Sequence, residues 1–368
     1  MPREPGGGAA VVITAMGART AVGNDAVQTA AAVRAGINRF ARWEALPDEF
    51  DGEAGVNAAF LPEDLGDAPW VAKAEDLAPM PIHEALWQAE LYDFVAARQA
   101  RPQLKLAAYV ATPYPDRPGV SPDAYRLFAI EAREHCIAPA RADQVHLISG
   151  EHAAGLIALA RAVADLRSGA ADIAVVGAVD SLLHGEFLRA LAAAGRLKLP
   201  DRPTGLIPGE AAAVLVLERA RDAQARGARP LGRLGAVAVD QEKIPLGPEH
   251  PIRAEAASRA VQSALQEGES GGAADIHRII VDLTGERWRS LEWSLVETRC
   301  LGGMPRGWQL WHPADCLGDV GAAGGLVHVV LALRAFARGY GGPGGVLISA
   351  AAERGERAAT CVFPVEEA

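Results

Sequence analysis

The alternation of apolar and polar residues predicts a strand, a helix and a second strand in close succession near the middle of the chain. Apolar residues predict a strand over 145–148, and over 153–167 they recur at helical spacing until Gly169 ends the helix. A second strand is predicted over 173–176. The N-terminus of a buried helix therefore falls near residues 151 and 152, where backbone N–H groups and the helix dipole favour negative charge or a developing oxyanion.

The same order of elements occurs twice along the chain. Strands are predicted over 10–14, 106–112, 145–148, 173–176 and 211–218, and again over 231–239, 278–283, 346–349 and 358–365. The start of a second long apolar helix, Ala322-Ala323-Gly324, matches Ala153-Ala154-Gly155. Because both helices are apolar nearly all round, we expect them to lie buried between two similar halves. The halves are residues 1–228, with an irregular cap at about 38–80, and residues 229–368.

Composition excludes several classes of function. Half of the 368 residues are hydrophobic, so the chain can bury a large core, and residues 1–10 lack the apolar run of a signal peptide. The net charge of -10 argues against nucleic-acid partners and anionic membranes, and no apolar run is long enough to predict a membrane span. The four cysteines and the histidines share no ligand spacing, so we expect neither a metal nor a cofactor. Free thiols indicate a cytoplasmic protein.

Several segments resemble the β-ketoacyl synthases, the condensing enzymes of the thiolase superfamily. The run VVITAMGARTAVGNDAVQTAAAVRAGINRF is similar to the N-terminal signature of that family, and residues 153–178 are similar to its nucleophile helix and following strand. IPGEAAAVLVLERARDAQARGAR resembles the GxGAG-type segment, and LGDVGAAGG resembles the GHxxGAAG segment. The resemblance spans the chain in the family's order. It implies an α/β fold, the thiolase-type duplicated αβαβα layered sandwich.

The resemblance also implies a chemistry from which this chain departs. In the family, a cysteine at the N-terminus of the central helix takes an acyl group from a carrier, and two histidines assist decarboxylation of a malonyl-type extender. The motifs place the nucleophile position on His152 and the two histidine positions on Thr284 and Gly318. Because none of these three positions keeps the family's residue, we do not expect ordinary Claisen condensation.

The neighbours of these positions are further candidates for a rebuilt site. Glu151 and Ser149 lie next to the nucleophile position, and Asp319 follows Gly318. The register around residues 149–152 is fixed only to about one position, and a slip of one residue would put Glu151 in the nucleophile place. In the simplest interpretation, His152 fills the space of the cysteine and hydrogen-bonds a buried backbone group.

Three functions are compatible with these residues, and whether the chain is an enzyme stays open. The first is a pseudoenzyme of fatty-acid or polyketide-type biosynthesis that resembles chain-length factors: a homodimer, or a heterodimer with an active ketosynthase, that shapes an acyl pocket and meets an acyl carrier protein. The second is an acyltransferase, decarboxylase or hydrolase in which His152 is a general base or nucleophile. The third is an acyl-binding module without chemistry.

Overall fold

The computed structural model describes residues 10–44, 55–91, 104–135, 144–243, 251–266 and 272–365. Its main sheet has ten strands in the order β10-β9-β11-β12-β8-β1-β7-β6-β4-β5. The strands on the β5 side are β1 (Val11–Thr20), β4 (Leu106–Thr112), β5 (Gln144–Ser149), β6 (Ile173–Ser181) and β7 (Glu210–Arg219). Those on the β10 side are β8 (Gly232–Gln241), β9 (Ile276–Val281), β10 (Gln309–Trp311), β11 (Gly345–Ala351) and β12 (Glu356–Phe363).

The two sets of strands share one connectivity. In each set the first strand pairs antiparallel with the last, and the last pairs antiparallel with the one before it. The other two strands then add in parallel. The sets join where β1 meets β8, with Val11 opposite Leu234. The predicted duplication is therefore confirmed in the topology, while the division between residues 228 and 229 stays a prediction.

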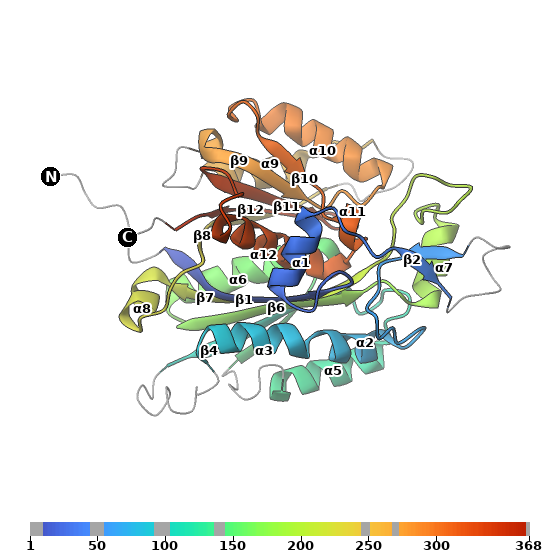
Figure 1. The fold of residues 1–368 in the computed structure, drawn as a ribbon, viewed down its shortest axis with the longest axis horizontal. Helices are drawn as coiled ribbons and strands as arrows, with labels where there is room; N and C mark the ends of the chain where they lie inside the picture. The colour runs from blue at the N-terminus through green and yellow to red at the C-terminus, as the bar shows by residue number, and fades with distance from the viewer. Residues whose placement is uncertain are drawn as a thin grey trace.

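Two apolar helices lie at the centre of the molecule, between the two sets of strands (Figure 1). They are α6 (Ala154–Ser168) and α12 (Gly324–Ala337), and each follows a short 3₁₀ turn, η1 (Glu151–Ala153) or η3 (Gly321–Ala323). Their contact is symmetric, because a Cβ on Gly155 would lie 3.2 Å from Leu326 Cγ and one on Gly325 would lie 3.1 Å from Leu156 Cγ. Gly325 is thus the counterpart of Gly155, so the match predicted from sequence was wrong by one residue.

Other helices cover the two outer faces, which gives the layered arrangement visible in Figure 1. The remaining helices are α1 (Ala26–Arg34), α2 (Trp70–Leu77), α3 (Pro79–Gln88), α5 (Pro122–His135), α7 (Gly185–Ala193), α8 (Ala220–Ala225), α9 (Glu255–Gln266), α10 (Arg287–Cys300), α11 (Ala314–Leu317) and the 3₁₀ turn η2 (Gly272–Asp275). The α2, α3 and α5 helices lie on one side, and α9 and α10 lie on the other. The predicted fold class, a thiolase-type duplicated αβαβα sandwich, is confirmed.

The prediction of an irregular cap over 38–80 was wrong for much of its length. The region contains α2 and a separate two-stranded sheet of β2 (Ala41–Trp43) and β3 (Val56–Ala58), while residues 45–54 lie outside the described part of the chain. Trp70, Ala74 and Leu77 are buried at helical spacing on α2. The Pro, Asp and Gly residues around this short helical pattern led the sequence analysis to predict an irregular segment.

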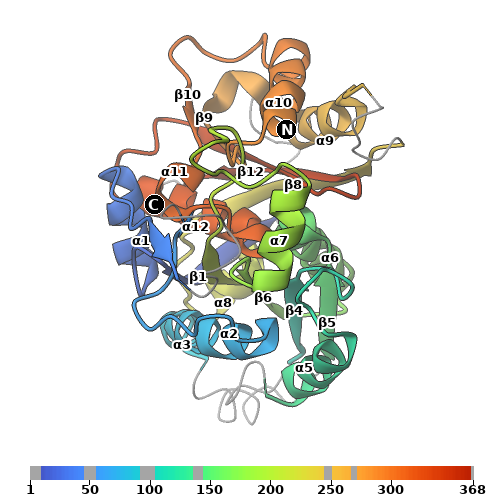
Figure 2. The same cartoon turned by 90° about the vertical axis from the view of Figure 1, so that its right-hand side faces the viewer.

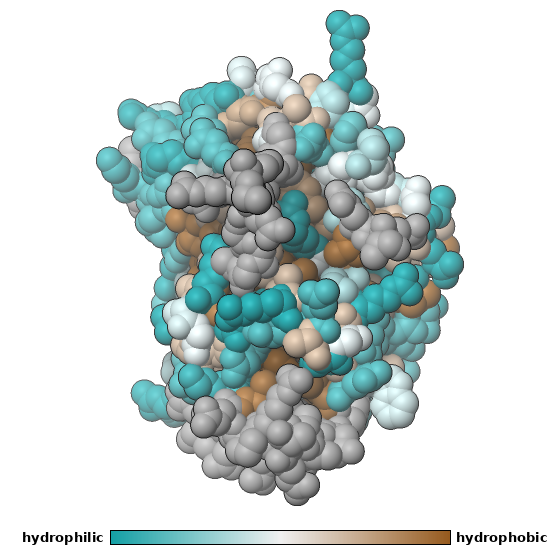
Figure 3. Space-filling view, turned by 90° about the vertical axis from the view of Figure 1, so that its left-hand side faces the viewer, coloured by the Kyte–Doolittle hydropathy of each residue, from teal (hydrophilic) through white to brown (hydrophobic). Residues whose placement is uncertain are grey.

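The face drawn in Figure 3 is mostly hydrophilic, and apolar atoms show only in small areas between polar side chains. In the part of the chain that the structure describes, no helix combines the length and the apolar character needed to cross a bilayer.

Candidate functional site

The turn at the start of α6 is sharp. Glu151 has a φ of 45°, a left-handed conformation that is unfavourable for a residue with a side chain. Its counterpart in the second half, Gly321, has a φ of 51° and carries no such cost. His152 follows directly, so its side chain leaves the chain at the N-terminus of the central helix.

His152 forms a buried pair with Asp319. The imidazole Nε2 lies 2.7 Å from Asp319 Oδ1, and the two residues are 5% and 1% exposed. Burial and the nearby Arg289 favour a neutral imidazole, but Asp319 outweighs them and raises the pKa of His152. Burial likewise opposes ionisation of Asp319, but His152 and then Arg289 outweigh it and lower its pKa. Each partner of the pair thus favours the charged form of the other.

A loop of the first half holds Asp319 in place. The Asp319 N–H donates to the Ile207 carbonyl at 2.7 Å, and the Gly209 N–H donates to the Asp319 carbonyl at 2.8 Å. Gly318 has a φ of 68°, and a Cβ there would lie 2.8 Å from the Ile207 oxygen. Gly318 therefore allows two backbones to approach closely, while its neighbour Asp319 makes the contact with His152.

Glu151 faces away from this pair, toward a second cluster of charges. Its Oε2 lies 3.3 Å from Nη1 of Arg117, which also donates to both oxygens of Asp180 at 2.9 and 2.7 Å. Asp180 accepts two more hydrogen bonds, from Trp70 Nε1 at 3.0 Å and from the Ala322 N–H at 2.9 Å. An acid of the first half thus caps the N-terminus of the second central helix.

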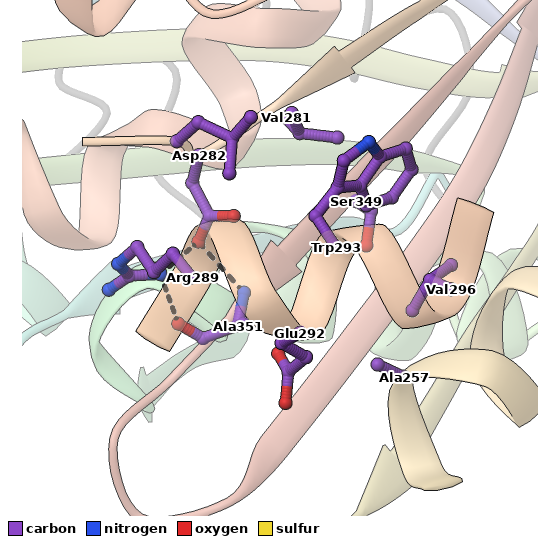
Figure 4. Close-up of a pocket in the computed structure, with 10 residues that line it drawn as sticks. Ala257, Val281, Asp282, Arg289, Glu292, Trp293, Val296, Ser349 and Ala351 are labelled. Atoms are coloured by element: carbon purple, nitrogen blue, oxygen red, sulfur yellow. Dashed lines mark hydrogen bonds and ion pairs between the residues drawn. The ribbon is translucent and has the colours of Figure 1, made fainter. Parts of the chain in front are cut away.

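Arg289 forms the third part of the site, from α10. Its Nη1 donates to Asp282 Oδ2 at 2.6 Å and to the Ala351 carbonyl at 2.7 Å (Figure 4). Its Nε donates to Glu286, which also accepts from Arg196 at 2.6 Å. Beside these residues is a cavity of about 20 Å³, which is room for about one water molecule and not for an acyl chain.

The structure places the remaining candidates less centrally. Ser149 is exposed at the end of β5, opposite Thr112 of β4. Thr284 follows β9, and its buried Oγ1 has no hydrogen-bond partner among the described residues. Its neighbour Gly285 accepts from the Gly205 N–H at 3.1 Å, so the loop that positions Asp319 also reaches this segment.

Sequence analysis did not single out several ionisable residues of this site, which are buried except for the partly exposed Arg196. They are Arg117, Asp180, Arg196, Glu286, Arg289 and His328. Burial lowers the pKa of His328 on α12 to about 4, so this imidazole is neutral. One signal was available, since Asp180 closes an otherwise apolar strand, β6.

Thiols and metal ligands do not gather at this site in the described residues. Burial raises the pKa of Cys316, and it raises that of Cys361 to about 12, which makes both thiols poor nucleophiles. Cys300 lies on α10 and hydrogen-bonds the Ser258 carbonyl. Over the same part of the chain, no group of three or more His, Cys, Asp or Glu side chains is arranged to hold a metal ion.

Part of the chain is similar in sequence to known proteins. Residues 144–223 match the family model described as beta-ketoacyl synthase, N-terminal domain. A Streptomyces coelicolor protein named as the actinorhodin polyketide beta-ketoacyl synthase 2 is 31% identical over 207 residues, which are 52% of this chain and 48% of that relative. The chain thus matches about half the length of this curated relative.

Solved structures agree with the fold. A type II polyketide ketosynthase in complex with its acyl-carrier protein matches with a TM-score of 0.79 at 18% identity, over 97% of this chain and 99% of that one. The ishigamide ketosynthase/chain length factor matches with a TM-score of 0.75 at 19% identity, again over 97% and 99%. The fold is that of the thiolase-type ketosynthases. The chain is similar in sequence to β-ketoacyl synthases over residues 144–223, as predicted, and one of the structures that share its fold is a ketosynthase/chain length factor.

Proposed function

We propose that this chain is a non-condensing ketosynthase-like protein of polyketide-type biosynthesis that pairs with an active ketosynthase. The observation that carries the proposal is the buried His152–Asp319 pair at the N-terminus of α6, where the family keeps its thiol. A nucleophile has to meet an acyl thioester, whereas His152 is 5% exposed and its Nε2 already contacts a carboxylate at 2.7 Å.

The other two aligned positions support the same conclusion. Thr284 has a hydroxyl where the family has an imidazole, and Gly318 has no side chain. A histidine could not replace Gly318 without moving the backbone, because a Cβ would lie 2.8 Å from the Ile207 oxygen. The imidazole of His328 is neutral, but His328 lies in the interior of α12 and is 5% exposed.

An open sheet edge supports a dimer. The β5 strand closes the strand order on one side and pairs with β4, and Figure 2 shows it at the outside of the sheet beside α6. Its sequence, QVHLIS, contains no Lys, Arg, Asp or Glu, and its four middle residues are half-buried. An uncharged edge strand of this kind is suited to pairing with another chain. In the resembled family, the strand before the nucleophile turn makes the dimer interface.

The names of two structural neighbours suggest the partners. One is a ketosynthase bound to its acyl-carrier protein, and the other is a ketosynthase/chain length factor. We therefore take an active ketosynthase as the partner across β5 and an acyl carrier protein as the source of the acyl group.

The first experiment measures both acylation and pairing. The purified chain is incubated with acyl- and malonyl-loaded carrier protein, and intact masses of both proteins are followed. We expect no adduct and no loss of carbon dioxide from the malonyl group. In light scattering with an active ketosynthase we expect a heterodimer. Leu147→Lys, on β5, should abolish it, and Leu127→Lys, on the exposed face of α5, should not.

A second candidate function is acid–base catalysis by the same pair. A histidine whose pKa is raised by a buried carboxylate is a common general acid or base. Conversion of malonyl to acetyl on the carrier, abolished by His152→Gln but not by His184→Gln at the N-cap of α7, would favour this candidate over the non-condensing role. Saturable acyl-carrier binding without turnover and without a ketosynthase partner would favour the acyl-binding module.

A further inference from the structure

We infer that the β10 end of the main sheet carries a docking surface for an acidic segment of a partner protein. The surface consists of Arg34, Arg278, Trp311, Arg338 and Tyr340. It lies at the opposite end of the strand order from β5, so it is separate from the edge proposed above for pairing. The inference therefore goes beyond the proposed function and does not depend on it.

The surface is built from arginine side chains stacked on aromatic rings. The Arg278 guanidinium lies 3.8 Å from the centroid of the Trp311 ring, and the Arg34 guanidinium lies 4.1 Å from that of Tyr340. The two rings lie between them, with centroids 6.1 Å apart and planes tilted by 35°. Figure 2 shows β10, α11 and α1 along one side of the molecule, with β5 on the other side. Residues far apart in the sequence thus form one continuous stack.

The inner end of the stack is held firmly by Arg278. This residue is 7% exposed, and its Nη2 donates to Gln309 Oε1 at 2.6 Å, while its Nη1 donates to the Tyr340 carbonyl. Burial lowers the pKa of Arg278, but a guanidinium stays protonated at neutral pH. Arg278 therefore fixes the two rings and also adds a positive charge to the surface.

The outer end of the stack is open to solvent. Arg34 lies in the last turn of α1, Arg338 is the C-cap residue of α12, and both are exposed. Over the described ranges of the chain, neither of them nor Arg278 forms an ion pair with a carboxylate. Asp315, which follows β10, is bound to His312 at 2.7 Å. The chain has a net charge of -10, yet the positive charge of this surface is left without a partner of its own.

The stacking favours carboxylates as the groups that these arginines bind. A guanidinium that lies flat on a ring keeps the N–H groups at its edge free, and their planar fork matches a carboxylate. Arg278 covers one face of Trp311, and Arg34 covers one face of Tyr340, so these faces are closed to a stacking nucleobase. Trp, Tyr and Arg are also the residues that contribute most to binding at protein interfaces. An acidic protein segment therefore fits this surface better than a nucleic acid.

The test measures binding of a short, fluorescently labelled, glutamate-rich peptide to the full chain by fluorescence anisotropy. We expect binding that weakens as the ionic strength rises, and none with the peptide in which every Glu is Gln. The double variant Arg34→Gln/Arg338→Gln should raise Kd by about tenfold. The matched control Arg126→Gln/Arg221→Gln removes two exposed arginines on α5 and α8, and should change Kd by less than about twofold.

Two further measurements test the stack itself. Tyr340→Leu removes the ring beneath Arg34 and should weaken binding, whereas Tyr340→Phe keeps the ring and should not. Phenylglyoxal modifies accessible arginines, and peptide mass spectrometry gives the rate at each one. The bound peptide should slow modification of Arg34 and Arg338 but not that of Arg126, whose side chain is 77% exposed. Circular dichroism checks that each variant is folded.

Several results would overturn the docking surface. They are no binding of the peptide, an equal loss of affinity in the two double variants, or equal protection of Arg126 and Arg34. Tighter binding of a single-stranded oligonucleotide of equal charge through the same arginines would indicate a nucleic-acid partner instead and would also refute the inference. None of these measurements uses a ketosynthase or a carrier protein, so their failure is distinct from failure of the proposed function.

Discussion

Replacement of Asp319 by Asn tests the pair at the centre of the site. The change keeps the shape of the side chain and an oxygen able to accept from the Gly321 N–H, but it removes the negative charge beside His152. The His152 and Asp319 side chains are 6% and 1% exposed and lie 2.7 Å apart. Loss of one partner of a buried ion pair costs about 3–5 kcal/mol. Because the hydrogen bonds partly survive, we expect a loss of about 3 kcal/mol in the free energy of unfolding, at the lower end of that range.

The stabilisation by the His152–Asp319 pair should depend on pH in a definite direction. The folded-state pKa of His152 is raised above the unfolded value of about 6.5, so its contribution is fully present below that pH and is lost as the pH rises through the folded pKa. The pKa of Asp319 is lowered, so its contribution is present above about pH 4 and is lost as the pH falls through the folded value. The difference in the free energy of unfolding between wild type and Asp319→Asn should therefore be largest between about pH 4 and 6.5 and should become smaller at alkaline pH.

Urea unfolding at pH 6 and pH 9, followed by circular dichroism, measures both effects. With a slope of about 3 kcal/mol per M, the midpoint should fall by about 1 M at pH 6. Asp240→Asn, which breaks the partly exposed pair with Arg259, is the control and should cost less than about 1 kcal/mol. If Asp319→Asn at pH 6 is no less stable than Asp240→Asn, or if its deficit grows in alkali, then the pair is not a stabilising imidazolium–carboxylate pair.

Three more changes follow from the packing around the helix N-termini. Gly321→Ala should lower the free energy of unfolding by at least about 3 kcal/mol, because its Cβ would lie 2.1 Å from Asp180 Oδ2. Gly36→Ala is also at positive φ but has open space around it, so it should lower the free energy of unfolding by about 1 kcal/mol. Equal urea midpoints for the two variants would contradict this prediction. Asp180→Asn should lower the free energy of unfolding by about 3–5 kcal/mol, because it leaves the buried Arg117 with only the more distant carboxylate of Glu151. A loss below about 1 kcal/mol would contradict this. Cys361, whose pKa burial raises to about 12, should resist iodoacetamide at pH 8 until urea unfolds the chain, and mass spectrometry of the alkylated peptides would reveal any faster reaction.

Local pattern was enough to predict the framework of the site. The period of the apolar residues located α6 and α12, and the repeated order of elements predicted two similar halves. Gly169, with a φ of 77°, ends α6 as its sequence indicated. These features depend on neighbours within one turn of helix or one pair of strands, which is the range over which sequence patterns carry information.

The contacts that define the site join residues far apart in the sequence, and local sequence patterns do not predict which of these residues meet. His152 and Asp319 are 167 residues apart, and the sequence named both as candidates. Arg117 lies in a loop, where an arginine is usually solvated, but it is buried here and bound by Asp180, 63 residues further on, and by Glu151. The motif alignment pointed to Gly318, but Gly318 lies in close contact with the Ile207 backbone, and it is the next residue, Asp319, that contacts His152.

The two halves bring equivalent turns together and fill them in different ways. At η3 the first residue is a glycine, and Asp180 from the first half occupies the helix N-terminus through the Ala322 N–H. At η1 the side chain of His152 is held by Asp319 from the second half. Each half thus supplies one buried acid to the turn of the other. A condensing enzyme needs one of these turns open, with a thiol and free N–H groups facing the substrate. In this chain Asp180 occupies one turn and Asp319 binds the side chain of the other, which agrees with the proposed non-condensing role.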